Sequence, residues 1–139
     1  MLYHIPKIFT PDLLRLMMDL GHGEELLICD ANFPRRTMEK ETVWITNSPV
    51  EALVREILCF FPLDATVDCP IAVMEGAAQN GMLDRFQALA PDKGIERVER
   101  FAFYERAKRC AGIVATTDGT RCANIILKKG VVTDGDGNR

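Results

Sequence analysis

Histidine, tryptophan and tyrosine are scarce in this sequence: its 139 residues include two, one and two of them. With only His4 and His22, and no His-Glu-x-x-His pair, a histidine-based zinc site is not expected. The sequence also lacks a Gly-x-Ser-x-Gly motif and a Gly-x-x-x-x-Gly-Lys phosphate loop. These absences argue against a common serine hydrolase and against a P-loop nucleotide-binding protein.

Cysteine is present, but without the spacing typical of zinc sites or disulfide frameworks. The five cysteines are an odd number and contain no Cys-x-x-Cys pair: Cys29, Cys59, Cys69, Cys110 and Cys122. We therefore expect neither a thiolate metal site nor a disulfide framework. The pattern is typical of a reducing compartment and predicts a cytoplasmic location.

The sequence has neither a strong excess of one charge nor a long apolar run. Its formal net charge is -3 and its pI about 5.4, so a nucleic-acid or anionic-membrane partner is not expected. The longest apolar run, around residues 57–63, is too short to span a bilayer, and the first residues do not resemble a signal peptide. The length suits one domain over residues 1–139, with a mobile tail from about residue 132.

Helical and strand patterns alternate along most of the chain. Helices are predicted at 11–20, 50–61, 82–89 and 101–109, and strands at 26–29, 43–45, 71–74, 95–98, 113–115 and 125–127. This alternation predicts an α/β protein, a three-layer α/β/α sandwich with a mostly parallel central sheet. Ser48 and Glu51 have the spacing of a capping box for the second helix. Asp118-Gly119 suggests a hairpin-like turn that adds the last two strands as antiparallel strands at an edge.

Two polar residues stand at positions where chemistry is plausible. His22 lies between two glycines after the first helix, where it is either a polar residue of a helix-ending turn or a proton-transfer group. Asp30 follows a strand that reads as buried on both faces, and in open α/β sheets ligands bind beyond the carboxyl ends of strands. Asp30 either caps the following turn or has a chemical role, in which it orients an imidazole or accepts two hydroxyls of a sugar. Asp134 to Asn138 imitates part of a calcium loop, but the closing glutamate is missing.

Four segments carry a more specific signal: 21–25 (GHGEE), 30–34 (DANFP), 100–107 (RFAFYERA) and 124–130 (NIILKKG). In their order and spacing they resemble the L-fucose mutarotase family, a branch of a group that also contains the D-ribose pyranases. The resemblance extends from near residue 5 to near residue 131, and the FAFYER block favours the fucose branch. It implies an α/β/α fold, a free pyranose as substrate and no cofactor. It also implies a ring-shaped homo-oligomer, often a decamer, with sugar sites near subunit contacts.

The resemblance also implies roles for individual residues. His22 corresponds to the acid/base residue, and the sugar-binding residues correspond to Asp30, Arg100, Cys122, Ala123 and Asn124. The family's last binding segment is usually Tyr-Gly-Asn, so Cys122 replaces a tyrosine and removes its hydroxyl and flat ring. Tyr104 is either a second proton-transfer group or a packing residue. Trp44 is either an apolar wall for the sugar or a residue of the core or of a subunit interface.

The expected reaction is the interconversion of the α and β anomers of a monosaccharide, with L-fucose as the first candidate. General acid–base chemistry suffices, because the sugar ring opens and closes without a redox step. Three alternatives stay open: the same reaction on D-ribose or another sugar, sugar binding without turnover, and a structural ring-forming subunit.

Overall fold

A computed structural model of the chain describes residues 1–136, which form four α-helices and one six-stranded sheet. The helices are α1 (Pro11–Asp19), α2 (Val50–Leu58), α3 (Met82–Leu89) and α4 (Arg100–Ala107). The strands are β1 (Glu25–Cys29), β2 (Thr42–Ile45), β3 (Ile71–Met74), β4 (Ile95–Val98), β5 (Gly112–Thr116) and β6 (Ile125–Lys128). All predicted helices and strands are present, although α2 ends at Leu58 instead of residue 61 and α4 ends at Ala107 instead of residue 109.

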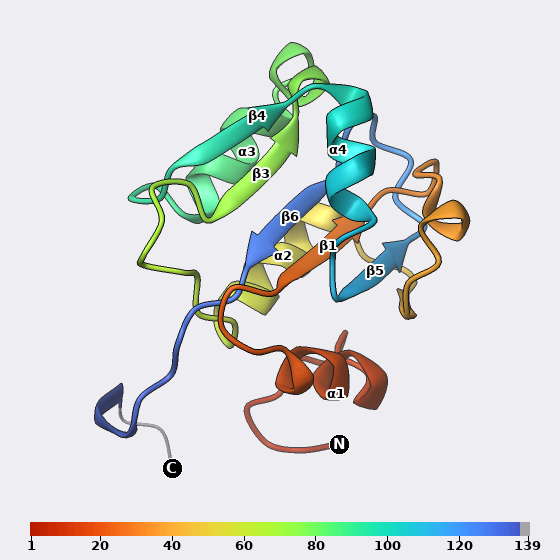
Figure 1. Cartoon of the computed structure of the whole chain (residues 1–139). Helices are drawn as coiled ribbons and strands as arrows, with labels where there is room; N and C mark the ends of the chain where they lie inside the picture. The colour runs from red at the N-terminus through yellow and green to blue at the C-terminus, as the bar shows by residue number, and fades with distance from the viewer. Residues whose placement is uncertain (137–139) are drawn as a thin grey trace.

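The sheet has the strand order β2-β5-β1-β6-β3-β4. Strands β2, β5 and β1 run parallel to one another, as do β3 and β4, and β6 runs antiparallel between β1 and β3. Figure 1 shows α4 in front of the sheet, α2 and α3 behind it, and α1 beyond one end. The predicted α/β/α sandwich with a mostly parallel sheet is therefore confirmed.

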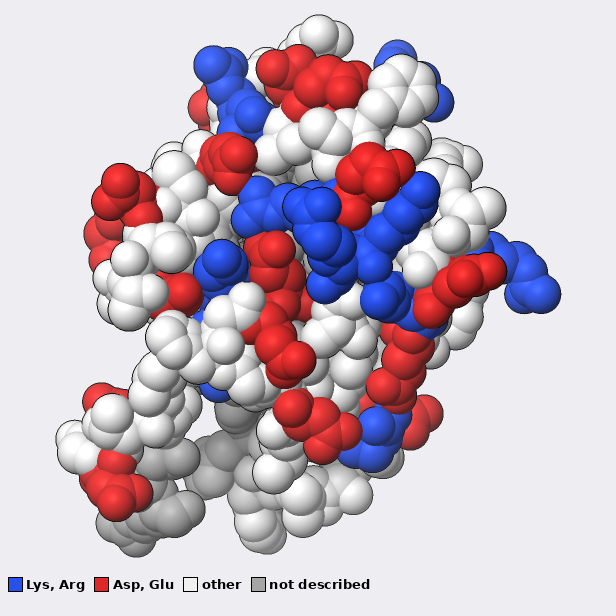
Figure 2. All heavy atoms as spheres, viewed as in Figure 1, with Lys and Arg blue, Asp and Glu red and all other residues white. Residues whose placement is uncertain are grey.

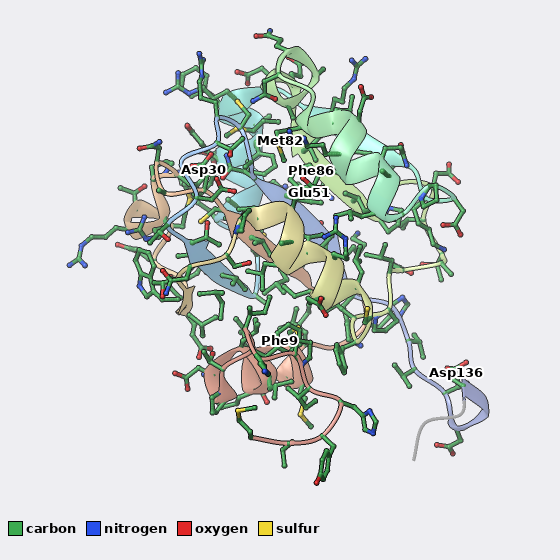
Figure 3. All side chains as sticks on the ribbon, turned by 180° about the vertical axis from the view of Figure 1, so that it is seen from behind. Phe9, Asp30, Glu51, Met82, Phe86 and Asp136 are labelled. Atoms are coloured by element: carbon green, nitrogen blue, oxygen red, sulfur yellow. The ribbon has the colours of Figure 1, made fainter. Side chains whose placement is uncertain are left out.

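Two apolar clusters lie on the two faces of the sheet. On one face, α1, α2 and α3 pack on alternate residues of the strands, including Leu26 and Ile28 of β1. On the other face, Phe103 and Ala107 of α4 pack on Leu27 and Cys29. In Figure 3 the α3 residues Met82 and Phe86 are labelled; both are almost fully buried in the first cluster. Both faces are thus covered, which explains why β1 has no alternation of polar and apolar residues.

The predicted hairpin between the last two strands is wrong. β5 and β6 are not neighbours, because β1 lies between them, and neither is an edge strand. Both strands are buried almost throughout, as expected of central strands covered on two faces. The Asp118-Gly119 segment instead belongs to a loop at the carboxyl end of the sheet, where the backbone oxygen of Asp118 accepts a hydrogen bond from the amide of Ala31.

The predicted capping box of α2 is also wrong. The hydroxyl of Ser48 donates to the backbone oxygen of Pro49 and does not cap the helix. The Asp118 carboxylate accepts the amide of Val50 at 2.8 Å instead. A distant loop therefore caps α2, which ties the carboxyl-end loops to the helix layer.

The carboxyl-terminal segment forms a short 3-10 helix at Asp134–Asp136, and residues 137–139 of the expected mobile tail lie outside the described residues. Within residues 1–136, no group of three or more His, Cys, Asp or Glu side chains is arranged to hold a metal ion. None of the helices in this part of the chain is long and apolar enough to cross a membrane.

Candidate functional site

A cavity of about 230 Å³ lies at the carboxyl end of β1. It is lined by residues from the carboxyl ends of β1 and β3, from α4 and from the loop before β6: Asp30, Asn32, Phe33, Met74, Arg100, Tyr104, Arg121, Cys122 and Asn124. Figure 3 shows Asp30 at the end of the sheet that is far from α1 and Phe9. The cavity is smaller than the roughly 300–1,000 Å³ pockets that hold drug-sized ligands, and suits a single sugar ring.

Asp30 and Asn124 form the polar floor of the cavity. The amide nitrogen of Asp30 donates to Oδ1 of Asn124 at 2.9 Å, and Nδ2 of Asn124 donates to Oδ2 of Asp30 at 3.1 Å. They meet because β6 runs antiparallel to β1, so the residue before β6 lies beside the residue after β1. Burial raises the pKa of Asp30, although the Asn32 amide and the Asn124 side chain oppose this effect. Both side chains are buried and fixed, which suits the recognition of hydroxyl groups.

Arg100 and Tyr104 form another wall of the cavity from the first turns of α4. Nε of Arg100 lies 3.2 Å from the Tyr104 hydroxyl, and the guanidinium carbon lies 5.7 Å from the centre of the Tyr104 ring. The Tyr104 ring packs edge-on against Phe33 at 5.4 Å between centroids. The tyrosine therefore lies in the same cavity as Asp30 and presents its hydroxyl beside a guanidinium.

The loop before β6 contributes Arg121 and Cys122 to the cavity. Cys122 has a left-handed backbone, with φ of 56°, and its sulfur packs so closely on Gly76 that a Cβ there would lie 2.7 Å from it. Ala123 is fully buried in the core and does not line the cavity with its side chain. Phe33 and Met74 provide the apolar surface of the cavity. Trp44, which was one candidate for this role, lies on β2 and lines a different hollow, where the guanidinium carbon of Arg35 is 4.1 Å from the centre of its ring.

His22 lies at the opposite end of β1 from this cavity. The amide of Gly23 donates to the backbone oxygen of Lys129, just after β6, and that of Asp64 donates to the oxygen of Lys128. These two bonds bring His22 and Asp64 together, and Nε2 of His22 lies 3.1 Å from Oδ1 of Asp64. The His22 side chain is 47% exposed and that of Asp64 is 4% exposed.

The Asp64 carboxylate is held as an acceptor. Oδ1 accepts the backbone amide of Thr66 at 2.9 Å and its hydroxyl at 2.7 Å. These bonds, and then His22, lower the pKa of Asp64 to about 2, against the opposing effect of burial. An ionised carboxylate only accepts hydrogen bonds, so Nε2 of His22 carries the proton of the pair. Nδ1 is then the ring nitrogen left to exchange a proton with another molecule.

One chain does not bring all the expected site residues together. Asp30, Arg100, Cys122, Asn124 and Tyr104 line one cavity, whereas β1, five residues and roughly 16 Å long, separates His22 from it. The suggestion that Asp30 orients the imidazole is therefore wrong within a single chain. Asp64 holds the imidazole instead.

Several residues of the two sites were missed from the sequence. Asp64 lies 42 positions from its partner, in a segment without a motif. Asn32 and Phe33 lie in the DANFP segment just after β1, and Met74 is the last residue of β3. Their positions at the carboxyl ends of strands could have identified them as cavity residues. Arg121 had no such signal, because the loop that carries it was taken for a hairpin turn.

Comparison with known proteins identifies the family and supports the fold. A family model described as the RbsD / FucU transport protein family matches residues 3–132. An L-fucose mutarotase of Actinobacillus pleuropneumoniae is 36% identical over 94% of this chain and 97% of its own length. The structure of the fucose mutarotase of Streptococcus pneumoniae in complex with L-fucose superimposes with a TM-score of 0.87, at 36% identity, over 95% of this chain and all of that one.

The structure of Bacillus subtilis RbsD complexed with D-ribose has the same fold, with a TM-score of 0.81 at 20% identity over 96% of this chain and all of that one. At this identity the likeness concerns the fold alone. The family model covers nearly the whole chain, and the resemblance seen in the sequence is confirmed. The chain belongs to the RbsD/FucU family.

Proposed function

We propose that this protein is a mutarotase that interconverts the α and β anomers of a free monosaccharide, with L-fucose as the first substrate to test. One observation carries the proposal: an exposed imidazole is oriented by a buried carboxylate, with Nδ1 left to exchange a proton. The L-fucose mutarotase relative and the fucose complex of a structural neighbour support the choice of sugar.

The reaction consists of balanced proton transfers. The anomeric hydroxyl loses its proton to a base while the ring oxygen gains one, and the bond between the anomeric carbon and the ring oxygen breaks to give an aldehyde. Rotation about the adjacent carbon–carbon bond, followed by the reverse transfers, closes the ring on the other face. His22 takes and returns the proton at the anomeric or ring oxygen, because neutral imidazole serves in both directions near pH 7.

The cavity residues bind the sugar. Asp30 and Asn124 bind hydroxyl groups, and the rigid donor fork of Arg100 directs further hydrogen bonds. The Tyr104 hydroxyl, beside that guanidinium, is the second proton-transfer candidate. Phe33 and Met74 provide an apolar wall, which a methyl-bearing 6-deoxy sugar requires.

We further propose that two copies of the chain complete each site. A sugar bound by Asp30 and Asn124 is separated from His22 of its own chain by the length of β1. His22 is exposed at a surface where a second copy could present its cavity. A ring-shaped homo-oligomer, with a decamer as the specific form, satisfies this requirement because each copy gives His22 to one neighbour and its cavity to another. A cytoplasmic location fits the five free cysteines.

A second candidate is sugar binding without turnover. It is favoured by Cys122, which stands in the cavity where the family usually has a tyrosine. The two candidates are separated by exchange NMR between the α and β anomers of L-fucose and of D-ribose. Faster exchange with either sugar supports the mutarotase and identifies the better substrate. Saturable binding without faster exchange would support the second candidate and contradict the first.

A further inference from the structure

Arg121 lies in the cavity and has no part in the reaction described above. The charged residues that line the cavity are Arg100, Arg121 and Asp30. Two exposed arginines and one buried carboxylate therefore line the cavity, and their formal charges sum to +1 when Asp30 is ionised. Neutral hydroxyl groups do not compensate a charge of this kind, whereas an anionic substituent does.

Among the described residues, the carboxylate of Asp30 forms no ion pair with either arginine and is hydrogen-bonded to neutral amides instead. Its Oδ1 accepts the Asn32 amide at 2.9 Å and its Oδ2 accepts Asn124. Within residues 1–136, neither Arg100 nor Arg121 forms an ion pair, whereas Arg106 is paired with both Glu25 and Glu96. Figure 2 shows basic side chains on the α4 face of the molecule with acidic side chains around them.

The loop holds Arg121 at the cavity. Nδ2 of Asn80 donates to the backbone oxygen of Arg121. The Asp118 carboxylate accepts the amides of Thr120 and Val50 at 2.9 and 2.8 Å, which fixes the loop on the start of α2. On the other side, the sulfur of Cys122 is packed against Gly76. The backbone of Arg121 is thus tied on both sides, so less conformational freedom is lost when its side chain binds a ligand.

We propose that the cavity takes a pyranose that carries a carboxylate, such as a free hexuronic acid, and that Arg121 is the residue that selects it. The inference rests on the proposed mutarotase function, but it names a sugar acid in place of L-fucose as the preferred substrate. A carboxylate accepts two parallel hydrogen bonds from one guanidinium, and such charge-assisted pairs are stronger than bonds between neutral groups. The small volume of the cavity favours a carboxylate on the sugar ring over a bulkier phosphate.

Matched pairs of sugars test the inference. D-galacturonate and D-galactose, and D-glucuronate and D-glucose, differ only at C6, and the acids are ionised at pH 7. We expect kcat/KM for anomer exchange to be about tenfold or more higher for each acid than for its neutral partner, because a hydrogen bond to a charged group is worth at least this much. Arg121→Met should lower this ratio about tenfold. Arg109→Met, which removes an exposed arginine outside the cavity, should leave it unchanged.

Calorimetric affinities for the same sugars decide the inference without turnover. Equal affinity for acid and neutral sugar, or a preference that Arg121→Met does not reduce, would overturn it. Stronger binding of galactose 6-phosphate than of galacturonate would also overturn the assignment of a carboxylate. Accelerated exchange of neutral sugars alone defeats this inference and leaves the proposed function standing. Absence of accelerated exchange with every sugar defeats the proposed function, while the affinities still report on Arg121.

Discussion

Nε2 of His22 lies 3.1 Å from Oδ1 of Asp64, although 42 positions separate the two residues in the sequence. The antiparallel course of β6 beside β1 produces this contact, because the end of β6 binds both the turn before β1 and the segment that carries Asp64. The pair has the features of an oriented general base: a buried carboxylate, a ring nitrogen held by it, and a second ring nitrogen on a half-exposed side chain.

Replacing Asp64 should slow the reaction without removing the imidazole. In Asp64→Asn, the side chain no longer fixes the proton on Nε2 of His22. We expect anomer exchange to fall about 10- to 100-fold, a part of the ~10²–10⁴-fold that general acid–base catalysis contributes. Exchange NMR measures the rate, and circular dichroism provides the control for folding. An Asp64→Asn protein with the wild-type rate would contradict an orienting role for this carboxylate.

The same carboxylate should make folding stability depend on acidic pH. Its pKa is about 2 in the folded protein, mainly because the Thr66 amide and hydroxyl bind the ionised form, whereas an unfolded Asp titrates near 3.9. A group with a lowered folded pKa stabilises the protein above its unfolded pKa, and this stabilisation is lost as the pH falls from about 4 to about 2. Urea denaturation over this range should show a steeper loss for the wild type than for Asp64→Asn. Parallel curves of unfolding free energy against pH for the two proteins would contradict the lowered pKa of Asp64.

Asp118 should matter more to stability than Ser48, despite the capping-box spacing of the serine. Burial alone would raise the pKa of Asp118, but the amides of Thr120 and Val50 hold it below its usual value, so the carboxylate caps α2 in its ionised form. We expect Asp118→Ala to lower the free energy of unfolding by about 0.5–2 kcal/mol, the usual effect of losing a helix cap. Urea denaturation with Ser48→Ala as the control checks this. A larger loss of stability for Ser48→Ala than for Asp118→Ala would contradict the assignment of Asp118 as the cap of α2.

Mixing two inactive variants tests whether copies share a site. His22→Ala and Asn124→Ala should each lose most of their activity, for different reasons. When they are unfolded and refolded together, a heterologous ring combines an intact His22 of one copy with an intact cavity of another, in about a quarter of the sites. Exchange NMR should then show recovered activity. No recovery, in a mixture that light scattering shows to be assembled, would contradict a site shared between copies.

The sequence predicted which elements occur better than how they are connected. Local patterns placed the helices and strands because apolar periodicity and proline and glycine positions act over a few residues. The position of β6 between β1 and β3 was missed, since an apolar run such as Ile125 to Leu127 shows that a strand is buried but not which strands it pairs with.

The residues of the candidate site were also predicted only in part. Asp30, Arg100 and Asn124 were found by motif and do line one cavity. Asp64 and Arg121 were not found, because their roles depend on contacts between distant segments. The family resemblance identified His22 as the acid/base residue. It did not reveal that β1 separates His22 from the cavity of its own chain.

The most direct test of the account is the exchange rate between the α and β anomers of L-fucose, measured by NMR with wild-type protein and with His22→Ala. The wild type should accelerate exchange, and His22→Ala should lose about 10²- to 10⁴-fold of that acceleration while remaining folded and assembled. Wild-type protein that leaves the exchange rate of every sugar tested at the value for buffer, or His22→Ala protein that retains full activity, would contradict it.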